Sequence, residues 1–326
     1  MIQTAILHGA GYVGRKLIEQ VLVHPELELA AVTSRSHAGE PIWAAHKHLR
    51  AQSPVHFTSS LDMEVDLVFV AAGHGQGAAA VSELRNSGFN GLLIDMSADF
   101  RLADPQTYLE RYEVEHPRPD LLSDAWYGLP EITGPPPKGT TLIANPGCFA
   151  SAISLALYPL SQAGLSSHVS VMALTGASGS GALAKAGTHY PSRAGNVKAY
   201  KVLEHQHEAE IDEMAPGISY SFVPVSGPFT SGIWGTAQFS EKNIDLAAQY
   251  HAAYDDHPLI RLWPGQIPEL HWSVGSPFTD IGWIQKGNQW VVGFAIDNLV
   301  KGAATQAIQN ANLALGFSET TGLFHV

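Results

Sequence analysis

The residues best suited to chemistry in this 326-residue chain are its single cysteine, Cys148, and two histidines, His205 and His207. Cys148 follows a turn-forming Asn-Pro-Gly and precedes an apolar stretch, FASAISLALYPL, that predicts a helix. A thiol in the first turn of a helix favours its anionic, nucleophilic form. Because free cysteines are also among the most often buried residues, this position alone leaves a core role and a nucleophilic role open.

The two histidines lie in the stretch NVKAYKVLEHQHEAEIDEM, together with Glu210. Histidine is the commonest proton-transfer group, so either ring could serve the sulfur as general acid or base. The H-x-H spacing followed by Glu also suits a metal site or a solvated polar patch. Alternate residues of a strand share a face, whereas a helix would splay the pair. We expect no metal here.

A nucleotide-binding turn is predicted close to the N-terminus. TAILHGAGYVGRKLIEQVLVHP contains a short apolar strand, a glycine turn and an amphipathic helix. In such a turn, Gly9 would allow the tight bend, Gly11 the close approach of a pyrophosphate, and Gly14 the packing of helix on strand. The turn is completed by three further cofactor candidates: Ala10, Tyr12 and Val13. A glycine turn that binds no ligand is the alternative.

The segment after the second predicted strand indicates which cofactor is preferred. Where an NAD site would carry an Asp or Glu against the ribose, this chain has Thr33, Ser34, Arg35 and Ser36. Hydroxyl groups and a guanidinium suit a 2'-phosphate, so we expect NADP(H) to contact Ser34 and Arg35. A solvated loop arginine is the other interpretation of Arg35.

The order of predicted elements indicates an α/β chain with two domains. Strands at 27–34, 65–73 and 90–97 alternate with a helix at 77–88, which predicts a doubly wound parallel sheet of Rossmann type. Beyond Cys148 the chain is richer in strands, at 168–174, 218–225, 232–239 and 280–296. We therefore expect an NADP-binding domain at 1–147, completed by a C-terminal helix at 300–326, and a catalytic and oligomerisation domain at 148–299.

Composition excludes several classes of partner. Hydrophobic residues make up 45% and charged residues 15%, and no apolar run reaches the roughly eighteen residues that a membrane span needs. The formal charge of −12 and the lack of a Lys/Arg cluster argue against nucleic acid. The N-terminus has no basic region before an apolar stretch, so we expect a cytoplasmic location. A single cysteine agrees with a reducing compartment.

With these residues assembled, the chain resembles the N-acetyl-gamma-glutamyl-phosphate reductase family of arginine biosynthesis over nearly its full length. This family lies in the same broad superfamily as aspartate-semialdehyde dehydrogenase. The resemblance implies a second domain of the glyceraldehyde-3-phosphate dehydrogenase-like type. The motifs that carry it are HGAGYVG, DMSADFRL at 95–102, WYGLPE at 126–131, NPGCFA around Cys148, TGASGSG at 175–181, EHQHEAEI at 204–211 and DNLVKGAA at 297–304.

The resemblance also implies roles for individual residues. Cys148 resembles the nucleophile and His205 the acid/base. Substrate-binding roles are implied for Arg101, Asn145, Tyr200, His207 and Glu210. Cofactor-binding roles are implied for Gly73 in AAGHGQG, and for Ser178, Gly179 and Asn298, although Asn298 could equally be a structural cap. The implied partners are a small acyl phosphate and further copies of the chain, as a dimer or a tetramer.

The implied reaction begins with attack of the Cys148 thiolate on the acyl phosphate, and hydride from NADPH then reduces the thioester. Three stretches depart from the family's usual pattern. Ser231 stands where many relatives carry an arginine before Gly-Ile. The stretches AAGHGQG and EHQHEAE also differ from the sequences that are commoner in the family. An N-succinyl or carrier-protein-linked glutamyl or aminoadipyl phosphate therefore stays open as the substrate. Aspartate-semialdehyde dehydrogenase chemistry and a non-catalytic NADP-binding regulator are the remaining alternatives.

Overall fold

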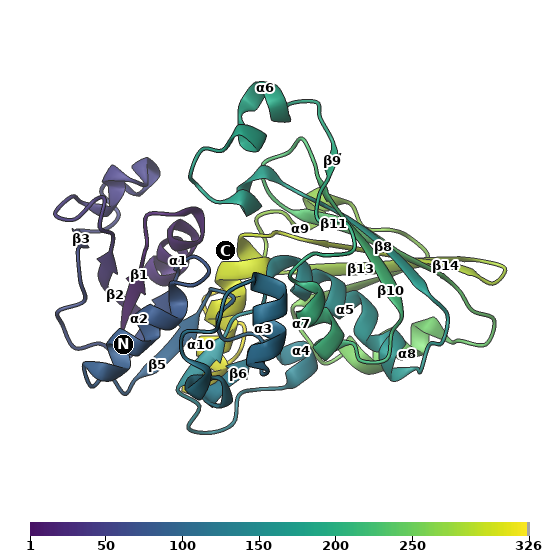
Figure 1. Ribbon diagram of the computed structural model, residues 1–326, viewed down its shortest axis with the longest axis horizontal. Helices are drawn as coiled ribbons and strands as arrows, with labels where there is room; N and C mark the ends of the chain where they lie inside the picture. Colours follow the sequence, from purple (N-terminus) through teal and green to yellow (C-terminus); the bar gives the residue numbers. More distant parts are fainter. Residues whose placement is uncertain (325–326) are drawn as a thin grey trace. The chain divides into compact units, whose positions relative to one another are not determined.

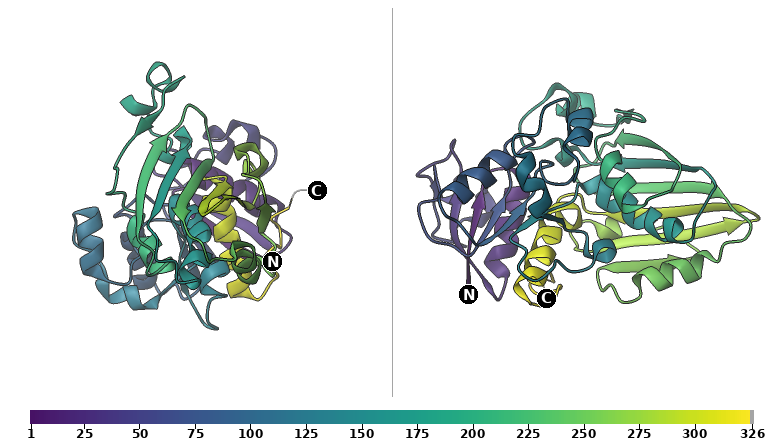
Figure 2. Two further views of the ribbon diagram at one scale, coloured as in Figure 1. Left: turned by 90° about the vertical axis from the view of Figure 1, so that its right-hand side faces the viewer. Right: turned by 60° about the horizontal axis from the view of Figure 1, so that its bottom comes forward.

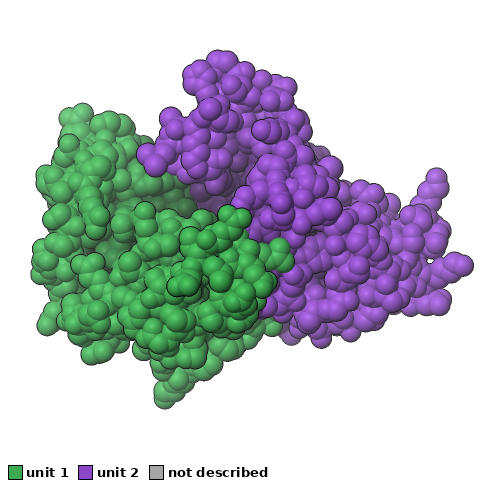
Figure 3. Space-filling view, viewed as in Figure 1, with its two compact units in different colours: residues 1–146, 303–326 green, residues 147–302 purple. Residues whose placement is uncertain are grey.

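The computed structural model describes residues 1–324 of the chain, which divide into two compact units, coloured separately in Figure 3. The first unit comprises Met1–Pro146 and the C-terminal segment that starts at Ala303, and the second comprises Gly147–Gly302. The division expected from the sequence had boundaries after residues 147 and 299, whereas the units change over after residues 146 and 302.

The first unit is built on a seven-stranded sheet in the order β3-β2-β1-β4-β5-β7-β6. Its strands are β1 (Ile2–Leu7), β2 (Leu27–Thr33), β3 (Phe57–Thr58), β4 (Leu67–Val70), β5 (Leu92–Asp95), β6 (Ala125–Tyr127) and β7 (Leu142–Ala144). All neighbouring strands run parallel (Figure 1). The strand order runs outward from β1 to β3 and then restarts on the other side of β1 at β4. This reversal is that of a Rossmann-type sheet, and it confirms the predicted α/β class.

Helices cover both faces of this sheet. They are α1 (Tyr12–Val23), α2 (Gly77–Asn86), α3 (Pro105–Tyr112), α4 (Pro130–Thr133) and α10 (Thr305–Leu315). Alternate residues of a strand point to opposite faces, and the core beneath α2 contains Ala5, Leu7, Val68 and Val70. Helix α1 contacts β1 and β2, and α10 contacts both α1 and β5. The C-terminal helix therefore packs into the first unit.

The C-terminal helix is shorter than the predicted range of 300–326. A π-helical turn at Val300–Ala304 precedes α10, which ends at Leu315 because Gly316 adopts a left-handed φ of 80°. Residues 325–326 of the predicted range lie outside the described residues. Within the part of the chain that is described, no helix is both long and apolar enough to cross a membrane.

The second unit contains a mixed sheet, drawn in Figure 2. Its seven strands lie in the order β12-β13-β14-β11-β8-β10-β9. Its strands are β8 (Val169–Thr175), β9 (Lys198–Ala199), β10 (Tyr220–Ser226), β11 (Ile233–Ser240), β12 (Ile260–Pro264), β13 (Thr279–Lys286) and β14 (Gln289–Ile296). The predicted late strand pair is confirmed as the antiparallel hairpin of β13 and β14. Strands β8 and β10 run parallel and end side by side at Thr175 and Ser226.

Helices cover one face of this second sheet. They are α5 (Cys148–Gln162), α7 (Glu208–Met214) and α8 (Leu246–Tyr254), while α6 (Tyr190–Arg193) and α9 (Leu270–Ser273) are single turns in connecting segments. Helix α5 contacts β11, β14, α7 and α8. Its interior position is secured by Tyr254, whose hydroxyl donates to the carbonyl of Leu155 at 2.7 Å. Cys148 is the first residue of this packed helix.

Candidate active site

Cys148 is the first residue of α5, and its side chain is half-buried. Gly147 precedes it in an extended conformation, and no side-chain hydrogen bond caps this helix start in the described structure. The helix macrodipole and the uncapped N–H groups therefore face the thiol and favour its anionic form. Gly302 lies against the same residue, because a Cβ added there would sit 2.9 Å from the Cβ of Cys148. The sequence predicted the helix start, which is confirmed, but not this neighbour.

Glu210 and His207 hold the residue before the cysteine. Glu210 is 1% exposed, and its Oε2 accepts the backbone N–H of Gly147 at 2.8 Å. The imidazole Nε2 of His207 lies 4.0 Å from Oε1 of the same carboxylate. A Cβ at Gly147 would approach the His207 ring to 2.6 Å, so only glycine fits here. These two predicted site residues thus contact the backbone beside Cys148.

His205 lies among aromatic rings. Its ring centroid is 4.7 Å from that of His207, 5.3 Å from Phe149 and 5.7 Å from Phe222. Burial, with further contributions from His207 and Lys201, lowers its pKa to about 2. Its Nδ1 accepts the backbone N–H of His207 at 3.2 Å. The imidazole is therefore neutral at ordinary pH and carries its proton on Nε2, where it can donate.

Tyr200 connects the histidine with the cysteine. Its ring centroid lies 5.8 Å from that of His205, and its backbone N–H donates to the carbonyl of Pro224 in β10 at 3.1 Å. Burial and the charge of Cys148 raise the pKa of the Tyr200 phenol, whereas the nearby Arg193 guanidinium lowers it. The phenol stays protonated and can donate a hydrogen bond to an anionic group beside the sulfur.

Ser178, Gly179 and Asn298, predicted to bind the cofactor, lie together in the second unit. The Asn298 side chain is 2% exposed; its Oδ1 accepts the N–H of Gly232 at 2.6 Å, and its Nδ2 donates to Ser178 Oγ at 3.1 Å. A Cβ added at Gly179 would lie 3.7 Å from Asn298 Nδ2. The geometry ties the segment after β8 to the one before β11, and a contact of these residues with nicotinamide stays a prediction.

The glycine turn of the first unit fits a nucleotide. A Cβ added to Gly9 would lie 2.2 Å from Val32, and one added to Gly14 would lie 2.5 Å from the Gly9 backbone. By contrast, a Cβ at Gly11 would meet no atom within 4 Å. Gly9 and Gly14 are therefore required by packing, whereas Gly11 leaves an open approach to the uncapped start of α1. The residues around Gly11 complete this turn: Ala10, Tyr12 and Val13.

Ser34 and Arg35 follow β2 beside this turn. The Ser34 N–H donates to the carbonyl of Thr58, while Arg35 is exposed. Burial and the charge of Arg35 lower the pKa of His8, which immediately precedes Gly9. The charge of Arg35 therefore acts on the residue just before the glycine turn. Gly73, after β4, is also exposed, and a Cβ there would meet nothing within 4 Å.

The DMSADFRL motif forms a buried polar network in the first unit. Arg101 Nε donates to the Asn145 carbonyl at 2.8 Å, and its Nη2 donates to the Met96 carbonyl at 2.9 Å. The Asn145 amide in turn donates to the carbonyl of Ala303 at 3.2 Å. Both predicted substrate residues thus make backbone hydrogen bonds, and their contact with substrate stays a prediction.

Asp99 belongs to the same network and was not predicted from the sequence. Its carboxylate accepts the N–H of Gly75 at 2.8 Å and that of Ala78 at 2.9 Å, which fixes the loop that contains Gly73. Neighbouring Asp95 is completely buried, and this burial raises its pKa to about 7. The sequence pointed to these two carboxylates only through the DMSADFRL motif, which implied no role for either of them.

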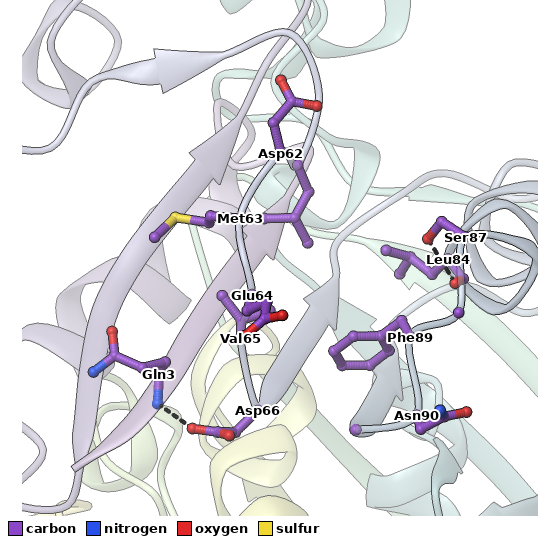
Figure 4. Close-up of a pocket in the computed structure, with 13 residues that line it drawn as sticks. Gln3, Asp62, Met63, Glu64, Val65, Asp66, Leu84, Ser87, Phe89 and Asn90 are labelled. Atoms are coloured by element: carbon purple, nitrogen blue, oxygen red, sulfur yellow. Dashed lines mark hydrogen bonds between the residues drawn. The ribbon is translucent and has the colours of Figure 1, made fainter.

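Two further features bear on where the site lies. Figure 4 shows a hollow lined by Gln3, Asp62 and Asp66, at the amino ends of β1 and β4. The glycine turn follows the carboxyl end of β1, so this hollow is at the opposite edge of the sheet from the turn. Within residues 1–324, no group of three or more His, Cys, Asp or Glu side chains could hold a metal ion.

Sequence comparisons identify similar proteins along the whole chain. Residues 3–136 match the semialdehyde dehydrogenase NAD binding domain, and residues 148–298 match the semialdehyde dehydrogenase dimerisation domain. A Thermomicrobium roseum protein, provisionally named a LysW-L-2-aminoadipate 6-phosphate reductase, is 40% identical over 99% of this chain and 97% of its own. The N-acetyl-gamma-glutamyl-phosphate reductase of Methanocella arvoryzae is 38% identical over 99% and 98%, respectively.

Solved structures share the fold. Aspartate semialdehyde dehydrogenase II of Vibrio cholerae, in complex with ASA, superimposes with a TM-score of 0.71 at 18% identity, over 97% of this chain and 98% of its own. The Candida albicans enzyme with NADP gives a TM-score of 0.61 at 14% identity, over 96% and 98%. At this level of identity, the likeness supports the two-domain fold alone.

Proposed function

Because the chain belongs to the semialdehyde dehydrogenase family, we propose that it catalyses the NADPH-dependent reduction of N-acetyl-gamma-glutamyl phosphate to N-acetylglutamate 5-semialdehyde and phosphate. The observation that carries this proposal is the half-buried Cys148 thiol at the start of α5, whose charge acts on the half-buried Tyr200, the ring neighbour of the buried His205. A cysteine with only a packing role in the core would not need these polar neighbours.

In the proposed reaction, Cys148 provides the nucleophile. The thiolate forms a C–S bond to the acyl carbon while the C–O bond to phosphate breaks, which releases inorganic phosphate and leaves a thioester. When bound, NADPH supplies the hydride that reduces this thioester. Hydride addition leaves a tetrahedral thiohemiacetal oxyanion. This oxyanion re-forms the C=O bond as the C–S bond breaks, which releases the semialdehyde and regenerates the Cys148 thiolate.

His205 is set up as the donor in these steps. With Nδ1 occupied by the N–H of His207, the neutral ring presents its proton at Nε2. That N–H can stabilise negative charge on the substrate oxygen as hydride is added. Backbone N–H groups in the first turn of α5 are the second source of such donors. Glu210 keeps the turn before Cys148 in place by accepting the N–H of Gly147.

NADP(H) is the proposed cofactor, bound at the glycine turn of the first unit. The open approach at Gly11 suits the pyrophosphate, and Ser34 and Arg35 suit a 2'-phosphate. We propose that the protein works in the cytoplasm as a homo-oligomer. The match of residues 148–298 to a dimerisation domain supports this, as do Met172 and Ile284, which are 41% and 44% exposed on the sheet face opposite α5.

A second substrate is favoured by a specific observation. The relative with 40% identity carries a name that specifies a LysW-linked aminoadipyl phosphate. In addition, the segment before β11 carries Ser231 at a position where the family resemblance implies an arginine. The same thioester chemistry would then act on an acyl phosphate whose amino group is attached to a carrier protein.

The decisive test is the reverse reaction, in which phosphate-dependent reduction of NADP⁺ is followed at 340 nm. N-acetylglutamate semialdehyde, its N-succinyl counterpart and a carrier-linked semialdehyde are compared, each with NADP⁺ and with NAD⁺. We expect turnover with NADP⁺ and the N-acetyl substrate, and its loss in Cys148→Ser. Exclusive turnover of the carrier-linked substrate would favour the second candidate. Undiminished turnover in the variant would refute the thioester route.

A further inference from the structure

Arg193 is a cation that lies outside all the motifs of the sequence. It ends α6, inside a segment whose other side chains reach solvent: Leu183 and Tyr190 are each 81% exposed. Arg193 instead turns back onto the ends of β8 and β10. Its Nη1 donates to the Ser226 hydroxyl, and its Nη2 donates to the Thr175 carbonyl at 3.2 Å. The segment around α6 is otherwise exposed, but the guanidinium of Arg193 lies at the carboxyl ends of β8 and β10.

The guanidinium is only partly satisfied there. Its Nε is buried and has no hydrogen-bond partner among the described residues. Burial lowers the pKa of Arg193 and the neighbouring Tyr200 partly opposes this effect, while no carboxylate of the described residues is among the groups that act on it. A half-buried cation with a buried, unused N–H and no counter-ion is costly unless an anion completes it. The planar fork of arginine suits a carboxylate or a phosphate.

Tyr200 links Arg193 to the candidate nucleophile, Cys148. Strand β9 pairs with Val225 and Ser226, and Tyr200 follows directly after it. The charge of Cys148 raises the pKa of the Tyr200 phenol, and the charge of Arg193 lowers it. The charges of Cys148 and Arg193 therefore both act on the same hydroxyl group, within one unit of the molecule.

The other candidates for binding a substrate anion are less suitable. Arg101 directs its Nε and Nη2 at the carbonyls of Asn145 and Met96. Position 231 is a serine, whose backbone N lies 2.6 Å from where a Cβ of Gly176 would be, next to Thr175. Arg193 thus reaches the same end of β8 from the opposite side. Resting on the proposed function, we propose that Arg193 binds an oxyanion of the substrate, either its carboxylate or its phosphate, beside Cys148.

One test needs no turnover. Alkylation of Cys148 by anionic iodoacetate is compared with alkylation by neutral iodoacetamide, because a nearby cation accelerates the anionic reagent selectively. Arg193→Gln should lower the ratio of the two rates by at least about fivefold. Lys185→Gln removes an exposed cation of the same segment and should leave the ratio unchanged. An unchanged ratio in a folded Arg193→Gln protein would overturn the proposal, whatever the substrate is.

Kinetics in the reverse direction then identify the anion, since semialdehyde and phosphate bind as separate substrates. Arg193→Gln should raise the KM for one of them about tenfold or more, with kcat less affected. A selective rise for phosphate assigns the phosphate, and a selective rise for semialdehyde assigns the carboxylate. If Arg193→Gln fails to fold, Arg193→Lys keeps the charge but not the fork. It should then keep the alkylation ratio yet raise the same KM, and wild-type values for both KM would overturn the proposal.

Discussion

The carboxylate of Glu210 accepts the backbone N–H of Gly147 at 2.8 Å, one residue before the candidate nucleophile Cys148. The two residues are far apart in the sequence, and both are tightly confined. A Cβ on Gly147 would come within 2.8 Å of Glu210 Oε1 and 2.6 Å of the His207 ring. The contact thus fixes the backbone position of the residue that precedes α5 and its first residue, Cys148.

Loss of this contact should affect both stability and turnover. Glu210→Ala leaves a buried N–H without its acceptor, which costs about 1–3 kcal/mol in the free energy of unfolding. Glu210→Gln keeps an acceptor oxygen and should recover most of that loss. Denaturant unfolding and kcat are measured on both variants. Equal stability of the alanine and glutamine variants would contradict the role assigned to this hydrogen bond.

Two glycines of the same turn should behave differently. Gly11→Ala places its Cβ in open space, so the unfolding free energy should stay within about 0.5 kcal/mol of wild type. Its KM for NADPH should rise at least about tenfold, because the methyl group occupies the approach to the backbone. Gly14→Ala forces a Cβ to within 2.5 Å of Gly9 and should lose about 1–3 kcal/mol of stability. An unchanged KM in Gly11→Ala would remove the turn from the cofactor site.

Arg35 should discriminate between the two dinucleotides. Only NADPH carries the 2'-phosphate, so Arg35→Gln should raise the KM for NADPH about tenfold and leave the KM for NADH nearly unchanged. The control is Arg50→Gln, which removes a guanidinium that lies 5.3 Å from the Trp43 ring centre. Equal changes for both cofactors in Arg35→Gln would show that this arginine does not read the phosphate.

Burial of His205 should make the protein sensitive to acid. Its pKa is about 2 in the folded chain and 6.5 when unperturbed, so between these values only the unfolded chain binds the proton. The stability linked to this group is complete above pH 6.5 and falls by about 1.4 kcal/mol per pH unit below it. His205→Gln should therefore reduce the pH dependence of the unfolding free energy between pH 6 and 4 by about one proton. The exposed His271→Gln is the control, and the same slope in both variants would contradict the burial of His205.

Association should depend on the sheet face opposite α5. Met172→Glu replaces an exposed apolar side chain of that face with a charge and should shift the protein toward monomers, as measured by light scattering. Leu183→Glu adds the same charge at an exposed position away from the sheet and should leave the assembly unchanged. Dissociation by the second variant alone would place the contact in the 180–200 segment instead.

Much of the fold was predictable because its signals are local. The strand, glycine turn and helix at 2–23 follow from residue spacing and from the conformations that glycine allows. The start of α5 at Cys148 and the hairpin of β13 and β14 follow equally from turn residues and apolar periodicity. Prediction was poorer for the C-terminal helix, because the π-helical turn and the stop at Gly316 carry no strong periodic signal.

The candidate site was predictable in its residue types but not in its contacts. Motifs pointed to Cys148, His205 and Glu210, yet the spacing could not tell that the buried carboxylate holds Gly147. The partners that make His205 a neutral donor come from α5 and β10: Phe149 and Phe222. Arg193 had no sequence signal at all, because its importance arises only where α6 folds back onto Thr175 and Ser226.

The division between the two sources of information has a physical cause. Backbone conformation and amphipathic period are set by neighbours a few residues apart, so strands, turns and helices can be inferred from the chain itself. Burial, proton affinity and the pairing of charges depend on side chains that approach across long sequence separations. Only the folded arrangement decides that Gly302 must lack a side chain beside Cys148, and which nitrogen of His205 holds the proton.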